Sequence, residues 1–431
     1  MKYYNEKIET MPKPEMEKLQ YQELKQLVTR LYANSPFYSG KMKEAGVRPD
    51  DIKCIQDITK LPFMRKTDLR DNYPDKLVCV PKDDVVRYHV SSGTTGKPTV
   101  VAYTKNDLAA WTELLARNFT MVGIKAGDIF QNAANYSLFT GGLGIHMGAE
   151  AIGCAVVPSG VGNTKRQIEM IQDFGVTALH CTPSYAMHLT EVAEEMNADL
   201  SSLKIGCFGA EAWSDNTRRD LENRLGVKAY DSYGMSELFG PGVAFECQEQ
   251  DGLHIWHDSY LVEIIDPKTG ETLEAGEKGE LVVTPLVKEA MPLLRYRTGD
   301  ITMLMEDDCE CGRGQKLARF FGRSDDMLTI RGINVFPSQI EHVLKNIPDV
   351  GDQFMVYIDR INHLDEMTIE VEMSKSVFSG ELADLSRLQA KIMKALQETL
   401  TIRARVELKE PGSLPRFEGK AKRIKDLRSK Q

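Results

Sequence analysis

The 431-residue sequence contains no long apolar run. No stretch approaches the roughly 20 consecutive apolar residues that a transmembrane helix needs. The opening residues, MKYYNEKIETMPK, are polar and lack the apolar core of a secretory signal. We therefore expect a soluble, cytoplasmic protein with no membrane partner.

The sequence also lacks an excess of basic residues. Its 54 Lys and Arg are outnumbered by 63 Asp and Glu, which gives a formal net charge of −9. Because nucleic-acid recognition needs a basic face, nucleic acid is not expected as a partner. Hydrophobic residues at 42% and charged residues at 27% are typical of a globular protein, and the length suits two or three domains.

Cysteines are few. The chain has eight, too sparse for a disulfide framework in a protein of this length. Five of them occur singly, several in apolar stretches, and we expect these to be buried thiols: Cys54, Cys79, Cys154, Cys181 and Cys207.

The other cysteines are grouped. Cys309 and Cys311 share a tight turn, and Cys247 and His254 lie on the segment that enters a β-rich region. Three thiolates and one imidazole would form a closed, structural zinc site. Free cysteines are the alternative, and His257 is a rival fourth ligand.

Short apolar runs alternate with helical patterns in the middle of the chain. Strands are predicted at 154–160, 176–183 and 205–211, with helices at 164–175 and 184–197 between them. This alternation indicates a largely parallel sheet, in which ligands bind at the carboxyl ends of the strands. The segments FGAEAW (208–213) and DSYGMSE (231–237) fall at such ends.

Further predicted elements complete an α/β fold with parallel-rich sheets. Helices are expected at about 15–31 and 105–121, and a β-rich subdomain at about 254–320. The last part predicts a helix near Ser338, two strands (354–359 and 367–373), a long helix (about 381–399) and a strand (402–408). We therefore expect a large N-terminal domain, 1–324, and a small mobile C-terminal α+β domain, 325–431.

The segment SSGTTGKP (91–98) joins two predicted strands, 85–90 and 99–103. Its glycines allow close backbone approach, and its hydroxyls, amides and lysine suit a polyphosphate. The nucleotide P-loop is excluded, because only two residues separate Gly93 from Gly96 and a proline follows Lys97. A polar surface turn is the alternative.

Six segments in this order resemble the motifs of the adenylate-forming superfamily, which includes acyl-CoA synthetases, luciferases and peptide-synthetase adenylation domains. They are SSGTTGKP, FGAEAW, YGMSE (233–237), YRTGD (296–300), GRSDDMLTIRGINVFPSQIE (322–341) and PRFEGKAKR (415–423). The resemblance covers nearly the whole chain. The short N-terminal region, and Ser236 where threonine is common, suit the phenylacetate–CoA ligase branch.

This resemblance implies ATP-dependent, AMP-forming ligation of an aryl acid, with phenylacetate favoured, to coenzyme A through an acyl-adenylate. It further implies Mg²⁺, a possible homodimer, and rotation of the C-terminal domain about Asp325 between the two half-reactions. An adenylyltransferase that acts on a coenzyme without CoA, or a non-catalytic nucleotide or metabolite sensor, remains the alternative.

The resemblance also implies roles for single residues. Two anions must react, so positive charge is needed at the reacting centre. Lys420 would contact the α-phosphate and the attacking carboxylate, and Glu237 would bind magnesium. Asp300 would accept hydrogen bonds from the ribose hydroxyls, Tyr233 would stack on adenine, and Arg323 would reach the phosphates. The full set of expected ATP-binding residues is Ser91, Ser92, Gly93, Thr94, Thr95, Gly96, Lys97, Gly209, Ala210, Glu211, Asp231, Ser232, Tyr233, Gly234, Met235, Ser236, Asp300 and Arg323.

The pocket for the acid is expected around NYSLFTGGLGIHMGAE (135–150). Tyr136 and Phe139 would form its walls, and glycines such as Gly141 would leave space for a ring. Residues that complete the pocket would be Ile145, Ala210 and Pro241. Ordinary packing of a helix on the core is the alternative.

Overall fold

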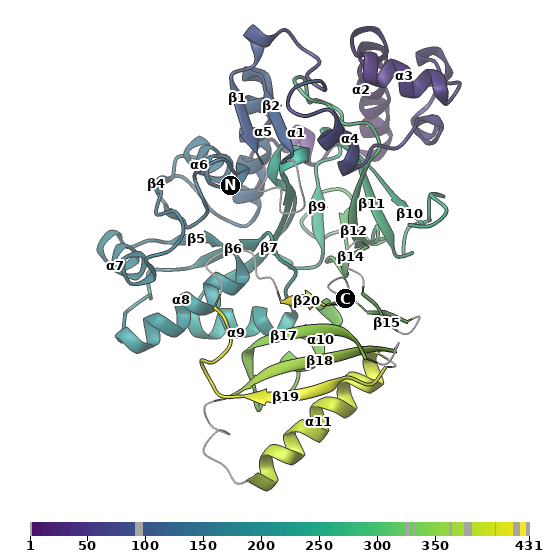
Figure 1. The fold of residues 1–431 in the computed structure, drawn as a ribbon. Coiled ribbons are helices and arrows are strands. Elements are labelled where there is room, and N and C mark those ends of the chain that lie inside the picture. The colour runs from purple at the N-terminus through teal and green to yellow at the C-terminus, as the bar shows by residue number, and fades with distance from the viewer. Residues whose placement is uncertain are drawn as a thin grey trace. The chain divides into compact units, whose positions relative to one another are not determined.

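The computed structural model describes residues 2–90, 98–324, 328–330, 333–335, 337–361, 364–374, 382–400, 402–416 and 423–427. Three predicted site elements lie outside the described residues: the segment 91–97, Asp325 and Lys420. The chain forms two compact units, whose elements are labelled in Figure 1. The first comprises Met1–Cys181, Asp199–Ala210 and Lys228–Arg319, and the second Thr182–Ala198, Glu211–Val227 and Phe320–Gln431. The domain boundary at 324/325 stays a prediction.

An eight-stranded sheet forms the centre of the first unit, in the order β13-β9-β8-β7-β6-β5-β3-β4. Strands β4, β3, β5, β6 and β7 are parallel, whereas β7, β8, β9 and β13 pair antiparallel. Their bounds are β3 Ile129–Asn132, β4 Ala155–Val157, β5 Ala178–Cys181, β6 Ile205–Gly209, β7 Lys228–Met235, β8 Gly240–Glu246, β9 Leu253–Ile255 and β13 Lys316–Leu317. The predicted α/β class with a parallel-rich sheet is confirmed.

Helix α5 Lys105–Met121 precedes β3, and helices α6 Thr140–Ala151 and α7 Thr164–Phe174 follow β3 and β4 of this sheet. Helices α5 and α6 pack on each other and on β8. Helix α5 begins with a capping box, in which the Thr104 N–H donates to Asp107 Oδ2 at 2.9 Å and the Asp107 N–H donates to Thr104 Oγ1 at 3.0 Å. The Asp107 carboxylate also accepts the N–H groups of Glu289 and Ala290. The cap therefore fixes the segment after β11 to the start of α5.

The remaining parts of the first unit are an N-terminal group of helices, a β-hairpin and a second sheet. The helices are α1 Glu6–Glu9, α2 Lys13–Asn34, α3 Pro36–Glu44 and α4 Lys66–Asp71, with 3₁₀ turns η1 Pro49–Asp51, η2 Ile55–Lys60 and η3 Lys82–Asp84. The hairpin is β1 Arg87–Val90 with β2 Val100–Tyr103. The second sheet contains the antiparallel strands β10 Tyr260–Ile265, β11 Gly279–Pro285 and β12 Tyr296–Thr302. The predicted β-rich region is thus present.

The single cysteines are only partly as predicted. Cys154, Cys181 and Cys207 are buried, but Cys54 is exposed and Cys79 is partly exposed. The prediction of burial was wrong for Cys54, because this residue is the N-cap of the surface turn η2. Within the described ranges, no helix has both the length and the apolarity needed to cross a bilayer.

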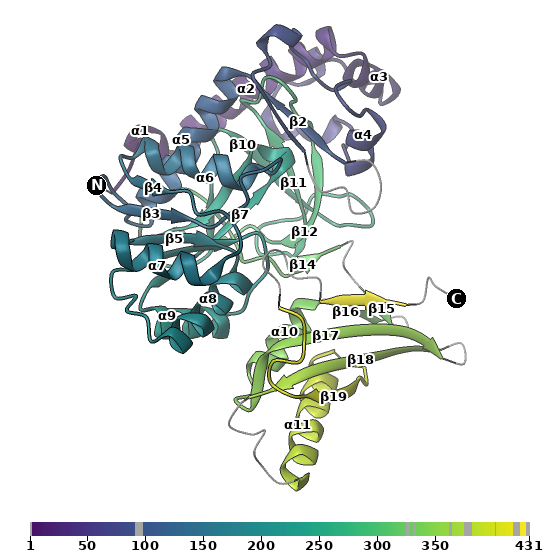
Figure 2. The same ribbon diagram turned by 60° about the vertical axis from the view of Figure 1, so that its left-hand side comes forward.

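The second unit contains a four-stranded sheet in the order β19-β18-β17-β20. Helices α10 and α11 contact each other and lie on one face of it (Figure 2). Val356, Ile369 and Ile392 are fully buried in the core between them. The bounds are α8 Pro183–Met196, α9 Asp215–Leu225, α10 Pro337–Lys345, α11 Leu382–Leu400, β14 Gly322–Arg323, β15 Leu328–Ile330, β16 Ile333–Val335, β17 Val350–Ile361, β18 Leu364–Met373, β19 Arg405–Lys409 and β20 Ile424–Asp426.

Candidate active site

The carboxyl end of β6 makes a strained turn. A Cβ atom on Gly209 would overlap Ser232 Oγ on β7, so only glycine allows the two strands to approach this closely. Ala210 follows with φ +67°, a left-handed conformation that costs an alanine about 1–2 kcal/mol. Strain of this kind concentrates at functional sites. The next predicted residue, Glu211, lies in the second unit, where its Oε2 accepts the Ser184 N–H at 3.2 Å.

Tyr233 and Asp300 are brought together from β7 and β12. The Tyr233 hydroxyl donates to Asp300 Oδ2 at 2.6 Å, and the Asp300 side chain is largely buried. A register shift between β11 and β12 interrupts the ladder opposite Leu281, and Gly299 adopts φ +79° there. This irregularity directs the Asp300 carboxylate to the tyrosine.

Other residues of the DSYGMSE segment make structural contacts. Asp231 Oδ2 accepts the Arg319 Nε–H at 3.1 Å, and the Ser232 hydroxyl donates to the Phe208 carbonyl at 3.3 Å. A Cβ on Gly234 would overlap the backbone of β8. These contacts hold β7 between its neighbours and leave the Tyr233 ring partly exposed.

Glu237 lies in the 3₁₀ turn η4 Ser236–Leu238, which directly follows β7. Its side chain is only 5% exposed, and its Oε1 has no hydrogen-bond partner among the described residues. The ammonium of Lys66 stands 3.7 Å from Oε1, at the outer limit of an ion pair. On the other side of the turn, Ser236 Oγ and Thr140 Oγ1 are 3.2 Å apart. A buried carboxylate oxygen without a donor is a potential cation ligand.

Lys288 is a residue near Glu237 that no sequence motif indicated. Its side chain is fully buried, and Nζ donates to the Glu237 backbone carbonyl at 2.8 Å. The ammonium lies 5.2 and 5.3 Å from the ring centroids of Tyr103 and Phe239. Burial lowers the Lys288 pKa to about 8, although the charges of Asp107 and Glu237 oppose this shift. The available signal was a single lysine inside the apolar stretch TPLVKEAMPLL.

The predicted pocket segment lies beside β1, the strand that precedes residues 91–97 in the chain. The Val90 N–H donates to the Leu138 carbonyl at 2.9 Å, and Phe139 is 36% exposed. The Tyr136 hydroxyl binds Asn132 and His146, and burial raises the Tyr136 pKa to about 12.

Ile145, Gly144 and Gly240 do not fit an open pocket. The Ile145 side chain has no exposed surface, so it belongs to the core, which corrects its expected place in the pocket lining. Gly144 and Gly240 instead make room for the Trp111 ring, whose Nε1–H donates to the Pro241 carbonyl at 2.9 Å. A Cβ on Gly141 would meet only Ala134 Cβ, at 3.6 Å. Core packing therefore explains Gly144 and Gly240, whereas it does not require a glycine at 141.

Two further predictions concern Arg323 and the zinc ligands. Arg323 lies on β14 in the second unit. The four predicted zinc ligands do come together, with the ligand atoms of Cys247, His254, Cys309 and Cys311 all within 4.8 Å of one another.

Comparison with known families supports the interpretation of the six motifs. Residues 9–285 match the AMP-binding enzyme family, and residues 332–428 match the AMP-binding enzyme C-terminal domain. A phenylacetate–coenzyme A ligase of Thermus thermophilus is 45% identical, with 99% of each chain covered. One of Escherichia coli is 43% identical, with 98% of this chain and 97% of the relative covered.

Solved structures agree with this result. A 2-hydroxyisobutyryl-CoA ligase in a postadenylation state, bound to an acyl-AMP, is 32% identical and has a TM-score of 0.94, covering 100% of this chain and 93% of its own. The same enzyme in its thioesterification state has a TM-score of 0.74 at 33% identity, with 99% and 92% coverage. The parts of that ligase therefore rearrange between the two states.

The predicted resemblance is thus confirmed. The protein is an AMP-forming acid–coenzyme A ligase that works through an acyl-adenylate, and its substrates are ATP, CoA and a small carboxylic acid. The chain belongs to the phenylacetate–coenzyme A ligase family of AMP-binding enzymes.

Proposed function

We propose that this ligase activates an aryl acid, with phenylacetate as the leading substrate, at the edge formed by β6, β7 and the turn η4. The observation that carries this site is Glu237, a buried carboxylate whose Oε1 has no hydrogen-bond partner among the described residues. The relatives named phenylacetate–coenzyme A ligase, at 43–45% identity, support the choice of acid.

Glu237 fits a magnesium ligand. Mg²⁺ prefers a carboxylate oxygen together with phosphate oxygens, and Glu237 Oε1 accepts no hydrogen bond among the described residues, with the Lys66 ammonium 3.7 Å away. When bound, Mg²⁺ would offset the negative charge of the ATP phosphates. Lys288 holds the backbone of this turn through a carbonyl, so the Glu237 carboxylate stays available.

The nucleotide is proposed to lie along β7. Asp300 would accept hydrogen bonds from the ribose hydroxyls, while the Tyr233 hydroxyl holds the other side of its carboxylate. The Tyr233 ring would cover one face of adenine, and the strained turn Gly209–Glu211 would cover the other. The 91–97 loop and Arg323 would bind the phosphates.

The chemistry needs two steps. The carboxylate of the acid attacks the α-phosphorus of ATP, which forms the acyl-adenylate and releases pyrophosphate. The CoA thiol, which loses its proton, then attacks the acyl carbonyl, which forms the thioester and releases AMP. We assign Lys420 to the first step, where its charge would stabilise the transition state. A C-terminal domain, 325–431, would then rotate about Asp325, in line with the rearrangement of the related ligase.

The acid is proposed to bind between the segment that leads into α6 and the start of β8. Tyr136 and Phe139 would contact its ring, and Ala210 and Pro241 would close the pocket near the adenylate. Gly141 leaves space on the same segment. Ile145 would support this wall from within the core.

The test is pyrophosphate and AMP release with ATP and Mg²⁺ across a panel of carboxylic acids, each with and without CoA. We expect AMP release that needs both phenylacetate and CoA, with the thioester identified by mass. Greater kcat/KM for indoleacetate, benzoate or 2-hydroxyisobutyrate would overturn the choice of phenylacetate. Pyrophosphate release without CoA dependence would favour the adenylyltransferase. ATP binding without turnover would favour the sensor. No observation on this chain favours either alternative.

Lys420 has its own test. Lys420→Ala should abolish adenylation but retain thioester formation from supplied acyl-adenylate and CoA, because only the first step needs a charge at the α-phosphate. Measuring the two half-reactions separately checks this. Loss of both half-reactions in a folded variant, or loss of neither, would refute the role.

We also propose a cytoplasmic location, where ATP and CoA are available, and a homodimer. Subcellular fractionation and light scattering of the purified protein test these two points. Activity in an extracytoplasmic fraction, or a monomer mass at working concentration, would overturn them.

A further inference from the structure

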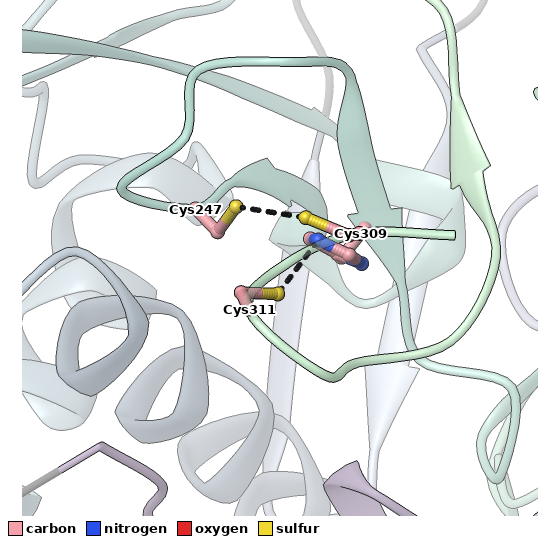
Figure 3. A group of neighbouring side chains, drawn as sticks. Cys247, Cys309 and Cys311 are labelled. Atoms are coloured by element: carbon pink, nitrogen blue, oxygen red, sulfur yellow. Dashed lines mark hydrogen bonds between the residues drawn. The ribbon is translucent and has the colours of Figure 1, made fainter. Parts of the chain in front are cut away.

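Four metal-binding side chains converge at the opposite end of the first unit's sheet from β4. Cys247 directly follows β8, His254 lies in β9, and Cys309 and Cys311 lie in the connection from β12 to β13. Figure 3 shows the side chain of Cys247 close to those of Cys309 and Cys311, which come from a different segment of the chain. Three of the four residues are buried, and Cys309 is partly buried. The cluster is therefore assembled by the fold and not by one short sequence motif.

The distances fit a tetrahedral ion. Cys247 Sγ lies 3.6 Å from Cys309 Sγ, and Cys311 Sγ lies 3.2 Å from His254 Nε2 (Figure 3). Zinc bonds of about 2.3 Å to sulfur and about 2.0 Å to nitrogen place neighbouring ligand atoms roughly 3.5–3.8 Å apart. A disulfide needs about 2.05 Å between the sulfurs, so the Cys247–Cys309 pair is not joined. Both measured contacts are close to the edges of a zinc tetrahedron.

The histidine is oriented for binding. His254 Nδ1 is 2.9 Å from the Gly314 carbonyl, which must accept the ring N–H. The lone pair of Nε2 is then directed at the sulfurs, and metal-ligating histidines are commonly held in this way. His257 does not join the cluster of metal-binding atoms found among the described residues. The structure thus selects between the two histidines that the sequence left open.

We propose that Cys247, His254, Cys309 and Cys311 bind a structural zinc ion. Soft thiolates with one imidazole favour zinc among the common divalent ions. Four protein ligands fill the coordination sphere, so the ion has no open position for substrate. Nothing in the adenylation chemistry calls for this ion, and its presence is independent of which acid the enzyme activates.

The ion would join segments that also carry the nucleotide site. It would fix the β8–β9 turn to the segment after β12, and β12 is the strand that bears Asp300. Strand β8 in turn pairs with β7, the strand that bears Tyr233. The N-terminal segment covers the same loop, because the Tyr3 hydroxyl donates to the Cys311 carbonyl at 2.8 Å. Loss of zinc should therefore loosen the N-terminal segment and the β7–β12 contact together.

Metal content tests the site directly. Protein purified without affinity metals or chelators should carry near-stoichiometric zinc by elemental analysis. Cys309→Ser should lose it, and Cys54→Ser should keep it as the matched control, because Cys54 is a free cysteine outside the cluster. Cys309 is chosen because it is the least buried ligand. Equal zinc in the two variants, or no zinc in the wild type, would overturn the proposal.

A second measurement uses the wild-type protein, in case Cys309→Ser does not fold. Exchange of the bound metal for Co²⁺ should give the absorption of a tetrahedral thiolate complex. A chelator should raise the number of rapidly reacting thiols by three. An octahedral Co²⁺ spectrum, thiol counts unaffected by chelator, or an intact mass showing a Cys247–Cys309 disulfide would each refute the site.

Discussion

The hydrogen bond from Tyr233 to Asp300 offers the sharpest test of the proposed nucleotide site. Tyr233→Phe removes one oxygen atom and keeps the ring. The lost bond is 2.6 Å long and its acceptor is a largely buried carboxylate, so it belongs to the stronger, charge-assisted class. Such a bond contributes about 1.5–3 kcal/mol to stability, and we expect the free energy of unfolding to fall by that amount.

The loss in the free energy of ATP binding should be smaller than the loss in the free energy of unfolding. In the variant, the Asp300 carboxylate is no longer held before ATP arrives, and ordering one such side chain costs about 0.5–1.5 kcal/mol. The KM for ATP should therefore rise by about 2- to 12-fold, since 1.4 kcal/mol corresponds to a factor of ten. The KM values for the acid and CoA should not change.

Initial rates of pyrophosphate release at varied ATP, with chemical unfolding on the same samples, measure both effects. Tyr357→Phe is the matched control, because the Tyr357 hydroxyl also donates to a carboxylate, Glu370, at 2.9 Å but lies in the second unit. An unchanged or lower KM for ATP in Tyr233→Phe would refute the reasoning. A lower KM would mean that the tyrosine competes with the ribose for Asp300.

Three further substitutions test neighbouring contacts. Glu237→Gln should lower the adenylation rate by about 100-fold or more and raise the Mg²⁺ requirement, which Mg²⁺ titrations check. Its Tm should be unchanged or higher in thermal unfolding, because a buried amide costs less than a buried carboxylate whose oxygen accepts no hydrogen bond. Lys288→Met removes a lysine whose folded pKa, about 8, is below its unfolded value. Between about pH 8 and 10.5 the unfolded wild-type chain therefore binds more protons than the folded one. The stability of the wild type relative to the variant should be lowest below pH 8 and should rise by about 3 kcal/mol across that window. Denaturant titrations at each pH measure this difference. Gly209→Ala should destabilise by about 1–3 kcal/mol, because the new Cβ overlaps Ser232, whereas Gly40→Ala, with open space around it in α3, should not.

Each of these outcomes has a clear opposite. A Tm loss in Glu237→Gln would show that the carboxylate has a structural partner. A stability difference for Lys288→Met that does not vary with pH would mean that the lysine titrates at its ordinary pKa. Equal stability of Gly209→Ala and the wild type would mean that β6 and β7 can separate.

Local patterns predicted the scaffold well. Helix α5 begins and ends where its pattern indicated, because the capping box at Thr104 and the apolar face are both encoded within about 17 residues. The βαβ alternation likewise gave strands β4, β5 and β6 within a few residues. Such features depend on neighbours in the chain and can be read without the fold.

The contacts of the site could not be read in this way. Tyr233 and Asp300 are 67 residues apart, and their hydrogen bond depends on sheet packing and on an irregularity in the β11–β12 ladder. The choice of His254 over His257 depends on where the strand ends, because His254 lies in β9, whereas His257 lies in the turn that follows it. Ile145 fitted a helical face, but only the packed structure shows that its face is the core side.

The turn after β7 combines strain, burial and a carboxylate oxygen, Glu237 Oε1, that has no hydrogen-bond partner among the described residues, and these are connected. Phe239 adopts φ +88°, and its carbonyl accepts the Tyr103 hydroxyl at 2.6 Å, while the Glu237 carbonyl accepts Lys288. The anchoring of η4 thus uses main-chain oxygens. Had Lys288 paired with the Glu237 carboxylate, the turn would be held equally well, but the carboxylate oxygen could no longer bind a metal cation. Burying a lysine against a carbonyl costs more than an ion pair would, and the metal-binding role that we propose for Glu237 would account for that cost.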